Sequence, residues 1–199
     1  PLPLDRGMTS DLLGFSRPCH TVLYGIMARG KMESIILSAL SQVMLTLSRL
    51  AEDLVLFTMP EFDYFKLPAE YTTGSSIMPQ KRNPDVLELV RAKTARVLAD
   101  ALGVCGIMKR MASGYNRDLQ ETKEPLMKGF DTTRSTLRIM TGLMRGISVR
   151  EDSLLAGFTP EVYATDWALD LVAGGMPFRD AYHHVKEHLD TLENMDPRE

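Results

Sequence analysis

A short polar segment at residues 74–84 gathers the reactive side chains of this sequence in one place. It reads Gly-Ser-Ser-Ile-Met-Pro-Gln-Lys-Arg-Asn-Pro, so two hydroxyls, an ammonium, a guanidinium and two carboxamides fall within nine consecutive residues. Gly74 frees the backbone at one end, and the two prolines stiffen the middle and the exit. Such a loop can close over an anion and present Ser75 or Ser76 to it. The alternative is a solvated connector between two helices, which is the commoner role of a Ser/Lys/Pro loop.

Three long helices are predicted to position this segment, over residues 29–57, about 84–111 and about 125–144. In each of them apolar residues recur at steps of three and four, which is the period of a helix in a bundle. The second helix can begin at a proline, because proline is tolerated in the first turn, and Asp85 and Glu88 there favour the positive end of the helix dipole. The apolar seam of the first helix is Ile36, Leu40, Val43, Leu47, Leu50, Leu54 and Phe57.

The two ends of the chain are predicted to contain shorter pieces. Residues 1–27 are interrupted by proline and glycine and are expected to be irregular. A threonine cap followed by proline predicts a helix over 159–173, and another proline opens a last helix over 177–192. No segment alternates like a strand. The sequence therefore predicts an all-α fold, with a long-helix bundle at 1–147 and a small, incomplete helical domain at 148–199.

Composition narrows the class of protein. The 199 residues carry 23 basic and 26 acidic side chains, a formal charge of -3, so neither a nucleic-acid footprint nor a polybasic membrane patch is present. Cys19 and Cys105 lie far apart, which argues against a disulfide framework and against a zinc site. With no visible signal peptide or membrane-spanning apolar run, we expect a cytoplasmic protein.

The segment 74–84, here called the signature loop, resembles the signature of the fumarase/aspartase superfamily. Within that superfamily the sequence is most similar to the argininosuccinate lyases, which usually carry a glutamine at the position of Gln80. Residues 113–123 resemble the loop with which those enzymes read the arginine side of their substrate, and 159–178 resemble their small C-terminal domain. The resemblance extends over nearly the whole chain and implies the long-helix fold of that superfamily.

The resemblance implies an elimination across a succinyl unit, with fumarate as a product. A proton must leave the carbon beside a carboxylate, so the reaction needs a base. It also needs a group that stabilises the doubly charged aci-carboxylate that forms. By the resemblance Ser75 is the base, and a nearby ammonium and backbone N–H donors are the available means of lowering its pKa. Lys81 suits that role and can also hold the developing negative charge. The family's residue at Glu88 orients an active-site histidine, whereas the simpler reading is a carboxylate at a helix N-terminus.

The resemblance places six further residues against the substrate: Arg29, Ser76, Asn83, Tyr115, Gln120 and Lys123. Asn83 can bond a substrate carboxylate or fix the loop. The phenol of Tyr115 and the amide of Gln120 suit guanidino and amino-acid groups, and Lys123 can pair a carboxylate. Arg29 resembles the family's carboxylate-binding arginine, although its surroundings read Arg-Gly-Lys where Asp-Arg-Asp-Phe is the commoner form.

The resemblance also implies partners. Superfamily enzymes use no metal or organic cofactor in this reaction, and they are homotetramers in which three subunits build each active site. None of the four histidines lies in the family's acid–base motif; they are His20, His183, His184 and His188. We therefore expect this chain to supply the signature-loop part of a site and to need the N-terminal portion of the enzyme to complete it. No nucleic-acid or membrane partner is expected.

The expected activity is that of an amidine-lyase, the reversible cleavage of argininosuccinate to arginine and fumarate. One alternative is another lyase of the superfamily, such as adenylosuccinate lyase or fumarase, and the loop at 113–123 argues against it. The other alternative is a catalytically silent protein of the same fold, like the lens crystallins related to these enzymes. The intact set Ser75, Lys81 and Glu88 argues against lost chemistry.

Overall fold

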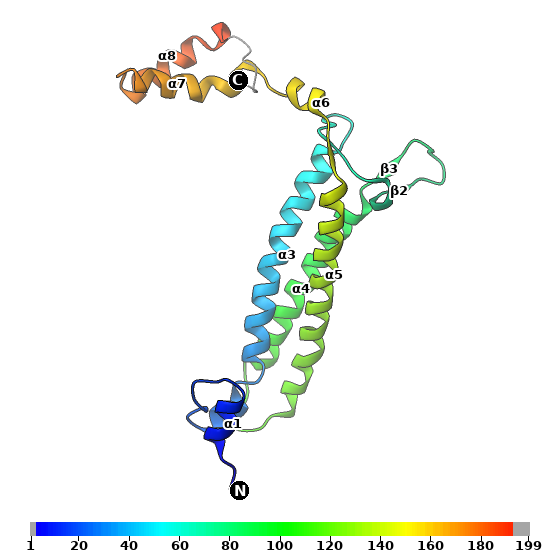
Figure 1. The fold of residues 1–199 in the computed structure, drawn as a ribbon, viewed down its shortest axis with the longest axis vertical. Coiled ribbons are helices and arrows are strands. Elements are labelled where there is room, and N and C mark those ends of the chain that lie inside the picture. Colours follow the sequence, from blue (N-terminus) through cyan, green and yellow to red (C-terminus); the bar gives the residue numbers. More distant parts are fainter. Residues whose placement is uncertain (1–2, 193–199) are drawn as a thin grey trace. The chain divides into compact units, whose positions relative to one another are not determined.

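Three long helices run side by side and alternate in direction (Figure 1). They are α3 (Lys31–Phe57), α4 (Asp85–Met108) and α5 (Lys123–Gly146). The structure is a computed structural model that describes residues 3–192. It confirms the all-α fold and each of the three long helices to within a few residues. Pro125 is the third residue of α5, where the missing N–H costs no intrahelical hydrogen bond.

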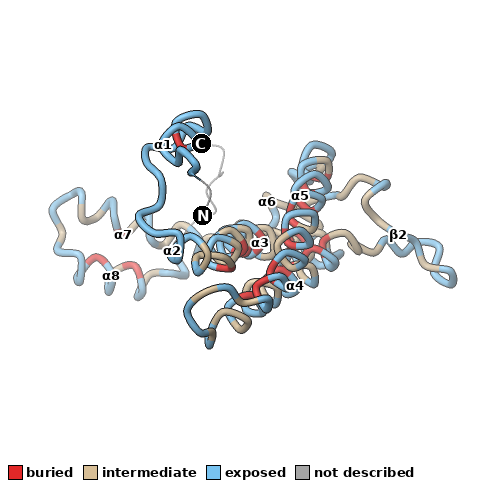
Figure 2. Tube along the Cα trace, turned by 90° about the horizontal axis from the view of Figure 1, so that it is seen from below, coloured by how far each residue is buried: buried red, intermediate tan, exposed pale blue. Residues whose placement is uncertain are grey.

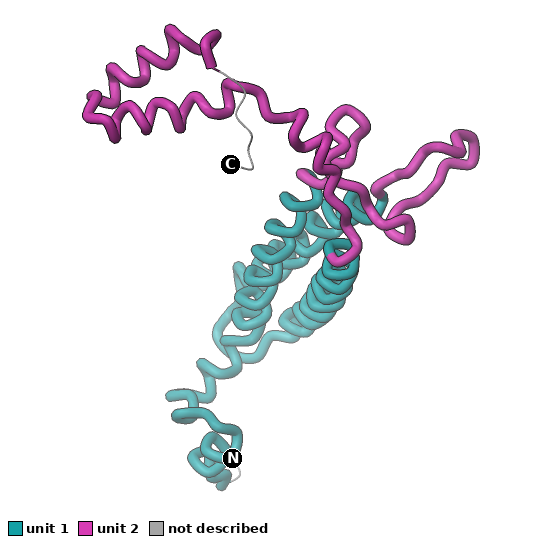
Figure 3. The backbone as a smooth tube through the Cα atoms, turned by 45° about the horizontal axis from the view of Figure 1, so that its top comes forward, with its two compact units in different colours: residues 1–52, 85–144 teal, residues 53–84, 145–199 magenta. Residues whose placement is uncertain are grey.

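The chain divides into two units (Figure 3). Unit 1 contains residues 1–52 and 85–144, and unit 2 contains residues 53–84 and 145–199. The boundary at residue 147 that we expected from the sequence stays a prediction.

The core of unit 1 lies between the facing sides of the three long helices, where Figure 2 shows the buried residues. The buried apolar side chains there are Leu37, Met44 and Ala51 of α3, Leu87, Val90, Val97 and Val104 of α4, and Met140 and Leu143 of α5. A buried hydrogen bond from the Thr94 hydroxyl to the Met44 carbonyl, 3.1 Å long, also joins α4 to α3. Burial of this apolar surface is the main stabilising term of such a bundle.

The seam predicted for the first helix is only partly buried. Its Leu54 is buried, whereas its Val43 is 38% exposed. Leu37, Met44 and Ala51, which the sequence indicates as a broadening of that seam, are fully buried. Helix α3 is apolar on more than one side, and the three–four period then fits two neighbouring stripes equally well. Packing against α4 and α5 selects one of them.

By length and composition α3 could also cross a membrane, but a single helix of this kind is weak evidence because core helices pass the same test.

The expectation that residues 1–27 are irregular is also wrong. Two short helices form there, α1 (Arg6–Leu12) and α2 (Val22–Met27). Each is started by a capping side chain: Asp5 accepts from the Met8 N–H at 2.9 Å, and Thr21 accepts from the Tyr24 N–H at 3.1 Å. Helices this short contain too few turns to produce a detectable apolar period.

Unit 2 contains two small antiparallel ladders. Strand β1 (Phe65–Lys66) pairs with β4 (Ser148–Val149), and β2 (Thr73–Gly74) pairs with β3 (Arg82–Asn83). Each strand has two residues, which is too short for an alternating sequence pattern, so the expectation of no strands missed them. A 3-10 turn, η1 (Ala69–Tyr71), lies between β1 and β2.

The remaining helices of unit 2 are short: α6 (Glu151–Ala156), η3 (Pro160–Tyr163), α7 (Ala164–Ala173), α8 (Phe178–Glu187) and η4 (Leu189–Thr191). The predicted helix at 159–173 is confirmed, with its first turn tightened to 3-10 geometry. The predicted last helix is shorter than expected, because α8 ends at Glu187 and gives way to η4.

Candidate active site

The β2–β3 ladder fixes the two ends of the signature loop. Thr73 pairs with Asn83 and Gly74 pairs with Arg82. Continuing this antiparallel register by one step places Ser75 opposite Lys81. The loop between them projects as the long turn of a hairpin (Figure 1). The spacing of six residues between the predicted base and the predicted cation therefore has a structural reason, since these two residues are the first pair beyond the ladder.

The Ser75 hydroxyl oxygen accepts hydrogen bonds from two backbone N–H groups. The donors are Ile77, at 3.2 Å, and Met78, at 3.1 Å. Hydrogen bonds donated to an oxygen favour its anionic form, so this turn provides the backbone donors that a serine base needs. The N–H of Lys81 donates to the Met78 carbonyl at 3.0 Å, which ties the lysine to the same turn. Ser75 is half-buried, and Lys81 is exposed.

The other predicted residues near the signature loop have simpler environments. Ser76 is exposed, so Ser75 is the hydroxyl that the turn organises. Asn83 is half-buried and its backbone forms the outer pair of the ladder, which agrees with a role in fixing the loop. Glu88 is exposed in the first turn of α4, where a carboxylate interacts favourably with the helix dipole.

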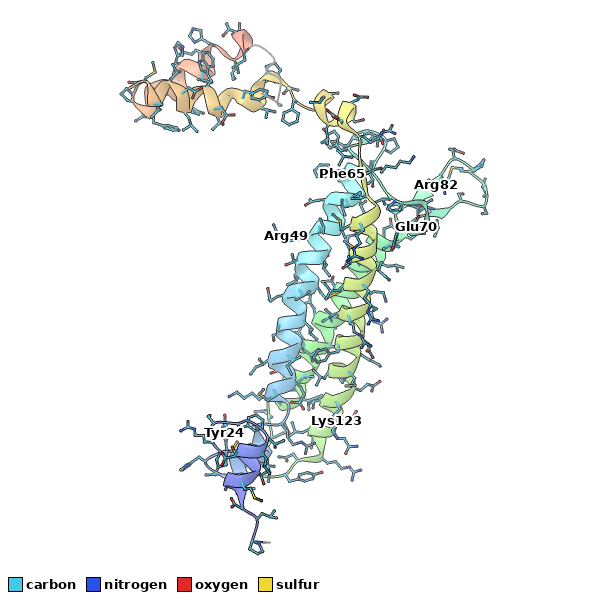
Figure 4. All side chains as sticks on the ribbon, in the orientation of Figure 1. Tyr24, Arg49, Phe65, Glu70, Arg82 and Lys123 are labelled. Carbon is cyan, nitrogen blue, oxygen red and sulfur yellow. The ribbon has the colours of Figure 1, made fainter. Side chains whose placement is uncertain are left out.

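A second group of predicted residues gathers at one end of the unit 1 bundle. The Arg29 guanidinium carbon lies 5.5 Å from the centroid of the Tyr115 ring, a cation–π distance. Gln120 belongs to the 3-10 turn η2 (Arg117–Thr122), and Lys123 is the first residue of α5. Figure 4 shows Lys123 at the end of the bundle where Tyr24 of α2 lies. Tyr115, Gln120 and Lys123 are exposed, whereas Arg29 is half-buried.

A polar hollow opens beside this second group, between the end of α4 and η2. Its volume is about 370 Å³, and its lining includes two cations and two carboxylates. The lining residues are Gly106, Ile107, Lys109, Arg110, Asp118 and Glu121. Mixed charge of this kind suits a zwitterionic group better than a simple anion.

Glu33 was missed by the sequence reasoning, although its carboxylate organises this end of the bundle. It accepts from the Gly30 N–H at 2.7 Å and from the Thr122 hydroxyl at 3.2 Å. A capping box could have revealed it. Gly30 precedes α3 and Glu33 follows three residues later, and a glutamate at that spacing is the second half of a capping box. The glycine at the cap position concealed it, because a capping box normally begins with serine or threonine.

Helix α4 separates Glu88 from the second group. Glu88 lies in its first turn, and Tyr115 follows its last turn. From Glu88 to Met108, the last residue of α4, the helix rises about 30 Å at about 1.5 Å per residue. Glu88 and Tyr115 of one chain therefore cannot contact the same small molecule.

Comparison with known proteins shows what the chain is similar to. Residues 31–99 match a family described as lyase. Over 190 residues, 96% of its length, the chain is 44% identical to an argininosuccinate lyase of Xylella fastidiosa. A relative from Stenotrophomonas maltophilia with the same name is 45% identical over 181 residues. The chain spans 42% of the length of either relative.

Solved structures of superfamily lyases share the fold. An EDDS lyase variant with bound fumarate has a TM-score of 0.69 at 23% identity. The match covers 95% of this chain and 38% of the EDDS lyase chain. The class II fumarase of Schistosoma mansoni has a TM-score of 0.64 at 15% identity, and the match covers 91% of this chain and 42% of the fumarase chain. At these identities the likeness establishes the architecture of the chain and not its substrate.

Proposed function

We propose that the protein containing this chain cleaves argininosuccinate to arginine and fumarate by β-elimination. The observation that carries the proposal is the signature loop, in which the Ser75 oxygen accepts two backbone N–H bonds. The ladder at the base of the loop supports it, because the next step of its register would bring Lys81 opposite Ser75. The names of the relatives at 44% and 45% identity support argininosuccinate as the substrate.

In this proposal Ser75 removes a proton from the carbon beside a succinyl carboxylate. The electron pair of that C–H bond passes through the aci-carboxylate to form the double bond of fumarate, the carbon–nitrogen bond breaks, and the guanidino nitrogen takes up a proton. The N–H groups of Ile77 and Met78 stabilise the serine alkoxide before the transfer. Lys81 stabilises the doubly charged intermediate. The resemblance assigns the proton donated to nitrogen to a histidine outside the signature loop, which Glu88 orients.

The second group of residues would read the arginine side of the substrate. Tyr115 and Gln120 offer a phenol and an amide, and the Arg29 and Lys123 cations can bind carboxylates. Because Glu88 and Tyr115 stand at opposite ends of α4, the two groups would serve different active sites. We infer that neighbouring subunits of a homotetramer complete each site, together with the N-terminal portion of the enzyme.

Exposed apolar side chains on the long helices support self-association. Leu102 of α4 is 72% exposed, Leu89 of α4 is 56% exposed, and Phe130 of α5 is 45% exposed. Contiguous exposed apolar surface commonly marks a protein interface. The proposal places the assembled enzyme in the cytoplasm and gives it no metal or organic cofactor.

The test is turnover by the complete polypeptide that carries these residues, followed at the absorbance of fumarate. We expect activity on argininosuccinate, and we expect Ser75→Ala to lower kcat by about 100- to 10,000-fold, which is the usual contribution of a general base. The comparison variant is Ser76→Ala, which removes the neighbouring hydroxyl, a predicted substrate contact, and should therefore affect KM more than kcat. Undiminished turnover in Ser75→Ala would refute the assignment of the base.

The same assay separates the alternatives. Turnover of adenylosuccinate or malate, without turnover of argininosuccinate, would identify a different superfamily lyase. A correctly assembled protein that processes none of the three substrates would be a silent relative, as the crystallins are. The organised Ser75 turn favours an active enzyme.

A further inference from the structure

The Glu33 carboxylate joins two segments that are far apart in the sequence. Glu33 is the third residue of α3, and it is half-buried. One carboxylate oxygen, Oε2, accepts from the Gly30 N–H at 2.7 Å, which caps the start of its own helix. The other oxygen, Oε1, lies 3.2 Å from the hydroxyl of Thr122, which is 89 residues further along the chain.

Thr122 is held firmly at its own end of this contact. Its side chain is fully buried, and its hydroxyl proton is shared between Glu33 Oε1 and the Leu119 carbonyl at 2.9 Å. Leu119 is only 3% exposed and packs under the same turn. The contact therefore ties the start of α3 to η2 at a point where η2 is anchored in the core.

The start of α3 is closely packed at Gly30. Gly30 has φ +80, and a Cβ atom there would lie 2.6 Å from the Met108 sulfur at the end of α4 and 3.2 Å from a Leu119 methyl carbon in η2. The start of α3, the end of α4 and η2 thus meet at this junction.

Residues that we assign to substrate binding lie directly beside the junction. Arg29 precedes Gly30, and its guanidinium lies over Tyr115. Gln120 and Lys123 flank Thr122 in the sequence. We propose that Glu33 is a positioning residue, whose two carboxylate oxygens hold the Arg29 segment and the Gln120–Lys123 segment in one binding arrangement. The identity of the substrate in this inference rests on the proposed function, whereas the contact between the two segments does not.

A carboxylate suits the geometry of the two donors. The Glu33 side chain accepts from two donors that approach from different elements, and a carboxylate offers one acceptor oxygen to each. In Glu33→Gln the amide oxygen can still accept from the Gly30 N–H, and the NH₂ group can donate to the Thr122 oxygen, whose proton then goes to the Leu119 carbonyl. We therefore expect Glu33→Gln to weaken the two contacts, because the charge is lost, and Glu33→Ala to lose both.

The structural part is tested by hydrogen exchange in the complete polypeptide, without any substrate. In Glu33→Ala, amide exchange across residues 117–123 should become at least about tenfold faster, because opening of η2 no longer breaks a contact to α3. Thr122→Val should accelerate exchange in the parent and have a smaller effect in the Glu33→Ala background, since both changes remove the hydrogen bond between Glu33 and Thr122. The part of the Thr122→Val effect that remains in that background reports its other bond, to the Leu119 carbonyl. Unchanged exchange in Glu33→Ala, or fully additive effects in the double variant, would overturn the proposal.

The functional part is tested by steady-state kinetics on argininosuccinate. We expect Glu33→Ala to raise KM about tenfold and to change kcat much less, with Glu33→Gln intermediate, because binding and not proton abstraction depends on the junction. Asp131→Asn, which removes an exposed ion pair on α5, is the control and should leave both parameters unchanged. An unchanged KM despite faster exchange would also overturn the positioning role. If the parent does not turn over argininosuccinate, the proposed function fails, and the exchange data still decide the structural part.

Discussion

At the scale of single residues, the signature loop derives its chemistry from backbone geometry more than from side-chain contacts. The sequence indicated that Ser75 would need N–H donors, and the structure supplies them from Ile77 and Met78. Which N–H groups point at the hydroxyl could not be predicted, because the same residues can form several turns. The register that would bring Lys81 opposite Ser75, if extended by one step, was likewise hidden, since it depends on a two-residue ladder.

Ile77 offers a test of the backbone donor that is independent of its side chain. The side chain is 87% exposed, whereas its N–H bonds to Ser75. Ile77→Pro removes that N–H and should lower kcat by about 100-fold, the typical cost of losing one donor to a catalytic oxyanion. Ile77→Ala keeps the N–H and should stay close to the parent. Equal activity of the two variants in the fumarate assay would show that the donor does not matter.

A residue-scale prediction of pH dependence concerns Glu124 in the first turn of α5. A hydrogen bond from Lys128 and the charge of that lysine hold the pKa of Glu124 below its ordinary value of 4.5. Because the folded-state pKa is lowered, this pair stabilises the fold at neutral pH, and its contribution is lost as the pH falls through the folded pKa. NMR titration should show the pKa of Glu124 returning toward its ordinary value in Lys128→Ala. Since both side chains are exposed, the change in unfolding free energy should be small.

At the scale of elements, the long helices were predictable because each carries its period over several turns. Three features were not. The buried face of α3 depends on which neighbour packs against an all-round apolar helix, and α1 and α2 depend on capping contacts of Asp5 and Thr21. The role of Glu33 depends on Thr122, a partner 89 residues away that no local pattern reports.

Gly30 allows an element-scale test of the junction between α3, α4 and η2. Gly30→Ala should destabilise the fold by about 2 to 4 kcal/mol, because the alanine is strained at φ +80 and its Cβ overlaps the Met108 side chain. Gly14 has a similar φ of +75 but no atom within 4 Å of an added Cβ, so Gly14→Ala measures the backbone strain alone. Denaturant unfolding of the two variants should show a larger loss at Gly30. Equal losses would mean that the junction can yield.

At the scale of the whole molecule, the proposed enzyme would need more than one chain for each active site. The fold class and the resemblance to lyases were accessible from the sequence, because the signature loop and the helix periods are both local. The sharing of each site between chains is implied by the resemblance, and the length of α4 between Glu88 and the Tyr115 group supports it. No property of the sequence near either residue reports that distance.

Shared sites predict that two inactive variants can complement each other. Glu88→Gln and Tyr115→Ala, each in the complete polypeptide, should both be impaired when assembled alone. Denaturing them together and refolding the mixture should restore part of the activity, because some sites then combine an intact Glu88 from one subunit with an intact Tyr115 from another. Refolding each variant separately is the control. A mixture no more active than its components would place both residues in a site built by one chain.

The length of α4 has a consequence for how this chain can vary. Inserting one residue in the middle of the helix would turn everything beyond it by about 100° and push it about 1.5 Å further along the axis. The orientation and distance of the Tyr115 segment relative to Glu88 would then change, even though neither residue had been substituted. We therefore expect related sequences to exchange exposed side chains along α4 while they hold its number of residues constant.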